Sequence, residues 1–192
     1  MDVNAPDTAE AGSPAVRQHR AHAPAVVRCA VLTISDTRTV ETDDGGRAIH
    51  DRLDAAGHEV IDQRILPDEP DAIRAQVSAW VEDDRVQVVL TTGGTGIAGR
   101  DTTYEALVGL LDKRIDGFGE LFRMLSYAEV GSAAMLSRAV GGLAGGTVIL
   151  AMPGSPAGVA LAMDRLVVPE IGHMAGEAAR GRDRTTTGRV TG

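Results

Sequence analysis

The residues best suited to chemistry in this sequence lie in the stretch TTGGTGIAGRD, which runs from Thr91 to Asp101. It is rich in glycine and follows the apolar run VQVVL. Glycines let backbone N–H groups approach a ligand closely, and the N-terminus of a following helix favours an anion. The stretch therefore predicts a phosphate cradle made of Thr92, Gly93, Gly94, Thr95 and Gly96.

A carboxylate at the end of this cradle needs an explanation, because Asp101 should repel a phosphate. A bound Mg²⁺ removes the conflict, since magnesium is commonly held by one or two carboxylates together with phosphate oxygens. Asp68 in LPDEP and Asp36 in ISD are further candidates. Simpler interpretations stay open: Asp101 could only stabilise a helix N-terminus, Asp68 could be a turn residue, and the glycine stretch could be a tight turn.

Strands and helices alternate along the chain and would position these residues. Apolar or alternating runs predict four strands, at 26–35, 58–66, 85–92 and 147–153. Helical spacing predicts helices near 45–57, 70–84, 102–111, 116–140 and 156–180, the fourth with breaks near Gly131 and Gly141. Thr102 and Glu105 have the spacing of a capping box, and Pro169 should kink or split the last helix.

This alternation predicts an α/β fold, a three-layer sandwich around a mostly parallel sheet. One domain is expected at 26–180, between a disordered N-terminal tail at 1–25 and a flexible C-terminal tail at 181–192. Ligands of such sheets bind beyond the carboxyl ends of the strands. Three loops are expected there: SDTRTVETDDGG, the glycine stretch, and PGSPAG with Gly154 and Ser155.

Composition excludes several classes of function. The net charge is −8 and only 3% of residues are aromatic, which disfavours a nucleic-acid binder. The single lysine, Lys113, does not follow a glycine-rich loop, so the chain has no P-loop lysine. One cysteine, no export signal and no membrane-length apolar run favour a cytoplasmic protein. The histidines lack zinc-ligand spacing.

Four motifs in order, TTGGTGIAGRD, GFGELFRMLS, MLSR and MPGSP, resemble the MoaB/Mog family of molybdenum-cofactor biosynthesis over about residues 26–175. The resemblance implies a MogA/MoaB-like, molybdopterin-binding fold. It also implies adenylylation of molybdopterin, in which the pterin's terminal phosphate attacks the α-phosphate of Mg-ATP and pyrophosphate leaves. It further implies that the chain forms trimers or hexamers, and that the molybdate-inserting enzyme of the pathway is a partner.

Carried over residue by residue, the family's two key aspartates are Asp68 and Asp101, expected to be catalytic and to hold Mg²⁺. The remaining positions match its substrate-binding motifs: Ser35 and Asp36 at the ligand rim, Ser126, Ser137 and Arg138 at the pterin, and Gly154 with Ser155 beside the nucleotide. Arg100 or Arg138 would supply any positive charge that the site needs.

The branch within the family decides between two expected functions. GFGELFRML and AMPGS are closer to the MoaB branch, some members of which lack part of the catalytic set. Because both aspartates are present, the sequence favours an active molybdopterin adenylyltransferase. The alternative is a catalytically silent MoaB-like molybdopterin-binding or carrier protein, and a scaffold module is a more distant third.

Overall fold

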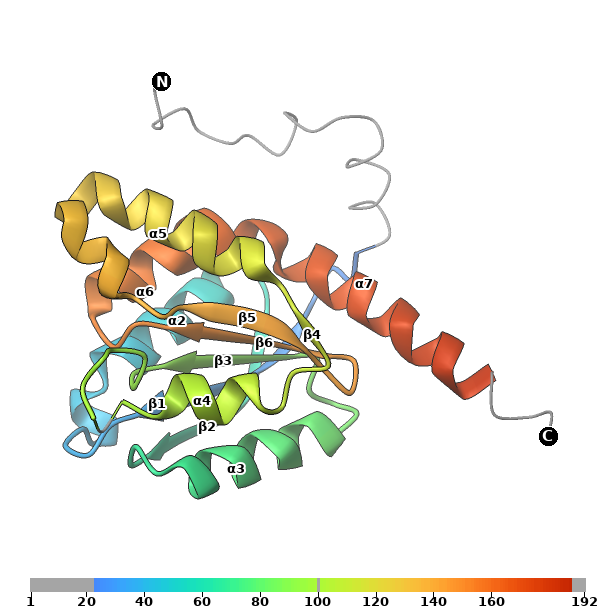
Figure 1. Cartoon of the computed structure of the whole chain (residues 1–192). Helices are drawn as coiled ribbons and strands as arrows, with labels where there is room; N and C mark the ends of the chain where they lie inside the picture. The colour runs from blue at the N-terminus through green and yellow to red at the C-terminus, as the bar shows by residue number, and fades with distance from the viewer. Residues whose placement is uncertain (1–22, 100, 188–192) are drawn as a thin grey trace.

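The computed structural model describes residues 23–99 and 101–187, with side chains as far as Arg180. Its centre is a six-stranded sheet in the order β2-β1-β3-β6-β5-β4 (Figure 1). The strands are β1 (Arg28–Ile34), β2 (Glu59–Leu66), β3 (Val88–Thr92), β4 (Lys113–Arg114), β5 (Val140–Ala144) and β6 (Thr147–Met152). β2, β1, β3 and β6 are parallel, whereas β5 and β4 are antiparallel to their neighbours.

Helices cover both faces of this sheet. They are η1 (Val40–Thr42), α2 (Asp44–Ala55), α3 (Pro70–Glu82), α4 (Thr103–Val108), α5 (Asp116–Val130), η2 (Gly131–Leu136), α6 (Pro156–Ala162), η3 (Met163–Val167) and α7 (Val168–Thr187). The hydrophobic core is split by the sheet. On one face α2, α5, α6 and α7 contribute Ile49, Phe122, Val159 and Ile171, among others. On the other, α3 and α4 contribute residues such as Ile73, Trp80 and Leu107.

The central strands explain why these layers form. All five residues of β3 are buried, as are Cys29 to Ile34 of β1, because each strand carries apolar side chains on both faces. Val31 and Leu90 face one helical layer, while Leu32 and Val89 face the other. Burial of one such side chain stabilises the fold by about 1.5–3 kcal/mol. The predicted three-layer α/β sandwich with a mostly parallel sheet is confirmed.

The sequence prediction was wrong for the antiparallel half of the sheet. Residues 116–140 were expected to be helical, with breaks near Gly131 and Gly141, and to lead to one last strand. α5 does end at Val130, before Gly131, but two further strands, β4 and β5, complete the sheet. Gly141 and Gly142 obscured β5 because glycine is rare in strands. Their lack of side chains is required here: a Cβ on Gly141 would lie 2.6 Å from Leu150 Cδ2.

The predicted final helix is divided before Pro169, as expected. A π-helical turn, η3, separates α6 from α7, and the Val168 N–H donates to the carbonyl of Met163. Pro169 has no N–H to continue the α-helical ladder, which accounts for an irregular turn here. α7 runs through residue 181, where the flexible tail was expected to begin, and ends at Thr187. Most of the predicted N-terminal tail, residues 1–22, lies outside the described residues.

In the part of the chain that the structure covers, no helix has both the length and the apolar character needed to cross a membrane.

Candidate functional site

The loops that carry the predicted site residues meet at one rim of the sheet. β2 runs parallel to β1, so the LPDEP turn lies at the same rim as the loops after β1, β3 and β6. The Ser35 N–H donates to the Leu66 carbonyl at 2.8 Å, and the Asp68 N–H donates to Asp36 Oδ1 at 3.3 Å. Parallel pairing of β1 and β2 thus places Asp36 beside Asp68.

Asp68 is hydrogen-bonded to Thr102, the residue directly after the glycine loop, which we define as residues 92–101. Its Oδ1 accepts a hydrogen bond from the Thr102 hydroxyl at 2.7 Å and from the Thr102 N–H at 3.2 Å. Thr102 follows Asp101 directly in the chain, so this pair of bonds ties Asp68 to the residue next to the second predicted catalytic aspartate. Oδ2 of Asp68 has no hydrogen-bond partner among the described residues and points toward Gly94.

Asp101 closes the glycine loop on itself. Its Oδ2 accepts a hydrogen bond from the Ala98 N–H at 2.7 Å, and its own N–H donates to the Ala98 carbonyl at 2.9 Å. A Cβ on Gly96 would lie 2.6 Å from Asp101 Oδ2. The carboxylate is therefore folded back over Gly96 and Ala98, inside the loop that precedes α4.

Two glycines of this loop could not be replaced without strain. Gly93 and Gly94 have φ of 103° and 61°, in the region that favours glycine. A Cβ on Gly93 would overlap the Ile34 carbonyl oxygen. A Cβ on Gly94 would overlap the Thr103 hydroxyl and lie 2.5 Å from Asp68 Oδ2. The close approach of backbone to carboxylate is thus possible only with glycine.

The Thr103 hydroxyl at this point is fully buried and has no hydrogen-bond partner among the described residues. Buried polar groups are almost always paired, so an exception calls for an explanation. Thr103 Oγ1 and Asp68 Oδ2 both lie against Gly94. The buried Thr103 hydroxyl and the half-buried Asp68 Oδ2 therefore both lie against Gly94 without a hydrogen-bond partner among the described residues.

Gly93 and Gly94 also border a polar cavity of about 210 Å³, here called the rim cavity. Its lining comes from the ends of β1, β3 and β6 and the start of α2: Thr33, Ile34, Ser35, Arg38, Asp43, Gly45, Thr92, Gly93, Gly94 and Gly154. Ser35 Oγ accepts bonds from the Thr37 and Arg38 N–H groups, which leaves its own proton free to be donated. Arg38 is the one cation in this lining.

A buried carboxylate anchors the rim cavity. Asp43 is only 2% exposed and accepts bonds from the Thr33 hydroxyl at 2.6 Å and from the Gly46 N–H at 2.8 Å. These bonds cap α2 and tie it to β1. Thr92 donates its hydroxyl to the Pro153 carbonyl at 2.8 Å, which fixes the PGSPAG loop to the end of β3.

Arg138 holds the other side of the glycine loop. Its guanidinium donates to the carbonyls of Thr95 at 3.4 Å and Asp101 at 2.7 Å, forms an ion pair with Glu105, and lies 5.1 Å from the Tyr104 ring centroid. These contacts correct the predicted capping box. Thr102 makes no side-chain cap on α4, because its hydroxyl is bound to Asp68 and Glu105 is paired with Arg138.

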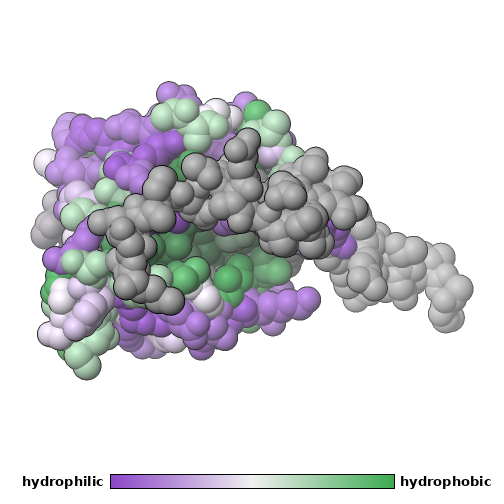
Figure 2. Space-filling model, turned by 90° about the horizontal axis from the view of Figure 1, so that it is seen from above, coloured by the Kyte–Doolittle hydropathy of each residue, from purple (hydrophilic) through white to green (hydrophobic). Residues whose placement is uncertain are grey.

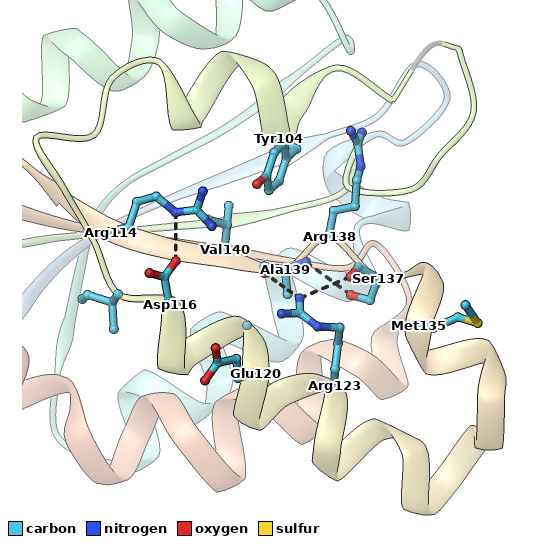
Figure 3. A pocket seen from close by; sticks show the side chains of 12 residues that line it. Tyr104, Arg114, Asp116, Glu120, Arg123, Met135, Ser137, Arg138, Ala139 and Val140 are labelled. Atoms are coloured by element: carbon cyan, nitrogen blue, oxygen red, sulfur yellow. Dashed lines mark hydrogen bonds and ion pairs between the residues drawn. The ribbon is translucent and has the colours of Figure 1, made fainter.

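A second cavity, of about 400 Å³, lies between α5 and the segment before β5 and is here called the α5 cavity (Figure 3). Its lining mixes charges of both signs with an aromatic ring and backbone: Tyr104, Arg114, Ile115, Asp116, Gly119, Glu120, Arg123, Met135, Ser137, Arg138, Ala139 and Val140. Arg114 pairs with Asp116 at 3.0 Å. Arg123 donates to the carbonyls of Ser137 and Ala139, both at 3.4 Å.

The other predicted residues fall at different places. Gly154 lines the rim cavity, whereas the exposed Ser155 caps α6 by accepting a bond from the Gly158 N–H at 3.2 Å. Ser137 and Arg138 line the α5 cavity. Ser126, on α5, lines none of the cavities described here. Arg100 lies outside the described residues.

Sequence reasoning missed several residues of the two cavities, among them Arg38, Asp43, Arg114 and Arg123. Asp43 carried a signal, since an aspartate three residues before Gly46 has N-cap spacing. Arg38 lies in the loop after β1, which was expected at the rim, but nothing singled out its side chain. Arg114 and Arg123 carried no signal, because they join the α5 cavity only through the packing of α5 and the antiparallel strands.

The chemistry of the paired aspartates fits a hard cation. Carboxylate oxygens are ligands that Mg²⁺ prefers, and it keeps further positions for phosphate oxygens or water. Between residues 23 and 187, apart from residue 100, no three His, Cys, Asp or Glu side chains gather closely enough to hold a metal by themselves. Any metal bound by Asp68 and Asp101 would therefore need further ligands that the described side chains do not supply.

Similar sequences and structures are known for most of this chain. Residues 30–173 match the family described as "Probable molybdopterin binding domain". The chain is 52% identical over 166 residues to molybdenum cofactor biosynthesis protein B of Bacillus cereus, covering 86% of this chain and 98% of that protein. A crystal structure of molybdenum cofactor biosynthesis protein B is 53% identical with a TM-score of 0.80, covering 82% of this chain and 99% of the other. The tungsten cofactor synthesizing protein MoaB from Pyrococcus furiosus is 33% identical with a TM-score of 0.73, covering 81% and 99%.

Proposed function

The chain belongs to the molybdopterin-binding domain family, with protein B of molybdenum cofactor biosynthesis among its relatives, and we propose that it is a Mg-ATP-dependent molybdopterin adenylyltransferase. The observation that carries this proposal is the bonding of Asp68 to Thr102, which brings both aspartates to the glycine loop. A carrier protein needs a pterin pocket but has no use for two carboxylates at a phosphate cradle.

In the proposed reaction an oxygen of the molybdopterin phosphate attacks the α-phosphorus of ATP. A new P–O bond forms, the bond from the α-phosphorus to the bridging oxygen of the β-phosphate breaks, and pyrophosphate leaves with that electron pair. Phosphoryl and nucleotidyl transfers of this kind depend mainly on positioning and charge neutralisation. The products are adenylyl-molybdopterin and pyrophosphate.

Each part of the site has a proposed role. Backbone N–H groups from Gly93 to Gly96 bind phosphate oxygens, and Asp68 and Asp101 hold Mg²⁺. The ion, when bound, neutralises phosphate charge and aligns the reacting groups. The rim cavity, with Ser35 and Gly154, accepts part of the nucleotide. The α5 cavity accepts the pterin, whose ring offers donors and acceptors to Arg114, Glu120 and Arg123.

The exposed apolar surface of α5 and η2 supports assembly into a homo-oligomer. Hydrophobic side chains gather in the middle of the face seen in Figure 2, on the side where α5 lies in Figure 1. Tyr127 is 64% exposed and Met135 is 76% exposed. A groove of about 400 Å³ passes between them and is lined by Arg123, Met124, Tyr127, Ser132, Ala134 and Met135. Large exposed apolar patches mark protein interfaces, so a trimer or hexamer of this chain is proposed to use this surface.

Arg123 and Met135 line both this groove and the α5 cavity. A neighbouring copy on the groove would therefore lie at the edge of the proposed pterin site. The molybdate-inserting enzyme of the pathway is the proposed recipient of the product.

The reaction is tested by measuring pyrophosphate release from purified protein, molybdopterin and Mg-ATP. We expect turnover in the wild type and a fall on the order of 100-fold or more in Asp68→Asn, because one of two metal-binding carboxylates is lost. Asp71→Asn is the matched control, since Asp71 lies nearby on α3 and pairs only with Arg74 among the described residues. Pterin binding without turnover in the wild type would show a carrier instead.

A further inference from the structure

Arg138 stands at the boundary between the two parts of the proposed site. It lines the α5 cavity, where a cationic side chain would be expected to contact a ligand. Its side chain nevertheless points away from Arg123 and the body of α5 (Figure 3). All of its side-chain hydrogen bonds in the described residues go to the glycine loop or to the first turn of α4.

These bonds hold the glycine loop at two points. Thr95 lies near its start, and its carbonyl accepts bonds from both the backbone N–H of Arg138 at 3.3 Å and the side-chain Nε at 3.4 Å. Asp101 lies at its end, and its carbonyl accepts a bond from Nη2 at 2.7 Å. Nη1 forms an ion pair with Glu105, so the same guanidinium also contacts the start of α4.

The carbonyl of Asp101 is covalently joined to the nitrogen of Thr102. The N–H on that nitrogen donates to Asp68 Oδ1 at 3.2 Å. One peptide unit therefore bonds to Arg138 on its oxygen side and to Asp68 on its nitrogen side. This peptide therefore links the guanidinium of Arg138 to the carboxylate of Asp68.

We propose that Arg138 is a positioning residue that sets the spacing of Asp68 and Asp101 through the Asp101–Thr102 peptide, and that it is not a pterin ligand. Its effect on catalysis rests on the proposed function, whereas its effect on the glycine loop does not. The guanidinium group donates in three fixed directions, to the carbonyls of Thr95 and Asp101 and to the carboxylate of Glu105. Only the planar guanidinium of arginine offers such a set of donors, since lysine ends in one compact ammonium group.

Hydrogen–deuterium exchange of the whole protein tests the positioning role without any ligand. In Arg138→Lys the amides from Gly93 to Thr103 should exchange roughly tenfold faster or more, because the Asp101 carbonyl loses its guanidinium donor and the Thr95 carbonyl keeps only the backbone N–H of residue 138. Glu105→Gln, at an exposed position, should speed exchange in the same segment by a smaller factor. Arg52→Ala is the matched control: Arg52 is also a half-buried arginine that joins distant elements, through Asp164, but it does not contact this loop.

Exchange in Arg138→Lys equal to that of the wild type, with Glu105→Gln also unchanged, would overturn the proposal. So would exchange that rises in the loop equally in Arg52→Ala, since the effect would then be general destabilisation.

Steady-state kinetics separate positioning from pterin binding. A positioning role predicts that Arg138→Lys lowers kcat by about 10- to 100-fold while the KM for molybdopterin changes less than about threefold. A raised KM with unchanged kcat would identify Arg138 as a pterin ligand and contradict the proposal. A wild type without turnover would overturn the proposed function, and the exchange measurement would then decide the role of Arg138 alone.

Discussion

The carboxylate of Asp68 accepts two hydrogen bonds from Thr102, one from its hydroxyl at 2.7 Å and one from its backbone N–H at 3.2 Å. The two residues are far apart in sequence and come from loops after different strands. Because Thr102 adjoins Asp101, this contact is what turns two separate motifs into one candidate metal and phosphate site.

Replacement of Thr102 tests that contact directly. Thr102→Val removes the hydroxyl but keeps the shape and the N–H, so Asp68 keeps one of its two bonds and can rotate. We expect kcat to fall about tenfold, the usual effect of a poorly positioned catalytic group. Thr102→Ser keeps the hydroxyl and should retain most activity. Equal kinetics in Val and Ser variants would contradict a role for the hydroxyl.

The glycine loop should tolerate a methyl group at one position and not at another. A Cβ at Gly94 would overlap the Thr103 hydroxyl and crowd Asp68, at a backbone φ of 61°. Gly94→Ala should abolish pyrophosphate release and lower the melting temperature, since the backbone conformation alone costs about 1–2 kcal/mol for an L-residue. Gly99→Ala is the matched control, because nothing lies within 4 Å of its added Cβ. Similar activity in both variants would refute the close approach at Gly94.

The buried pair of Thr33 and Asp43 should matter for stability. Thr33→Val deletes a 2.6 Å hydrogen bond to a carboxylate that is 2% exposed. We expect the free energy of unfolding to fall by about 1.5–3 kcal/mol, as for other bonds to charged groups, in urea denaturation. Thr39→Val, at an exposed position, should change it by less than about 0.5 kcal/mol. An unchanged midpoint for Thr33→Val would mean that Asp43 finds another donor.

The single cysteine should be unreactive in the folded protein. Burial in β1 raises the pKa of the Cys29 thiol to about 12, so the nucleophilic thiolate is scarce at pH 8. A thiol-specific disulfide reagent should therefore label nothing in the native state and one equivalent in denaturant. Rapid native labelling would show that β1 opens on the timescale of the reaction.

How much the sequence could predict depended on the length and type of each segment. β1, β3 and β6 were found because continuous apolar runs mark strands buried on both faces. β5 was missed because its register depends on contacts across the sheet, where Gly141 accommodates Leu150. β4 has two residues, which is too short for any periodic signal.

For the candidate site, the sequence indicated the residue types and not their partners. The glycine loop and both aspartates could be proposed from their motifs. The bond from Thr102 to Asp68 and the contacts of Arg138 depend on the topology of the sheet, which the order of elements leaves open. For the same reason Thr102 and Glu105 were misinterpreted as a capping box, although each is bonded to a residue more than thirty positions away.

The central claim is that this chain transfers an adenylyl group to molybdopterin at Asp68 and Asp101. The most direct measurement is mass-spectrometric detection of adenylyl-molybdopterin after incubation of purified protein with molybdopterin and Mg-ATP, beside Asp101→Asn. We predict the adenylylated product in the wild type and its loss in the variant, with pterin binding retained in both. Bound molybdopterin without any adenylylated product in the wild type would contradict the claim and identify the chain as a carrier.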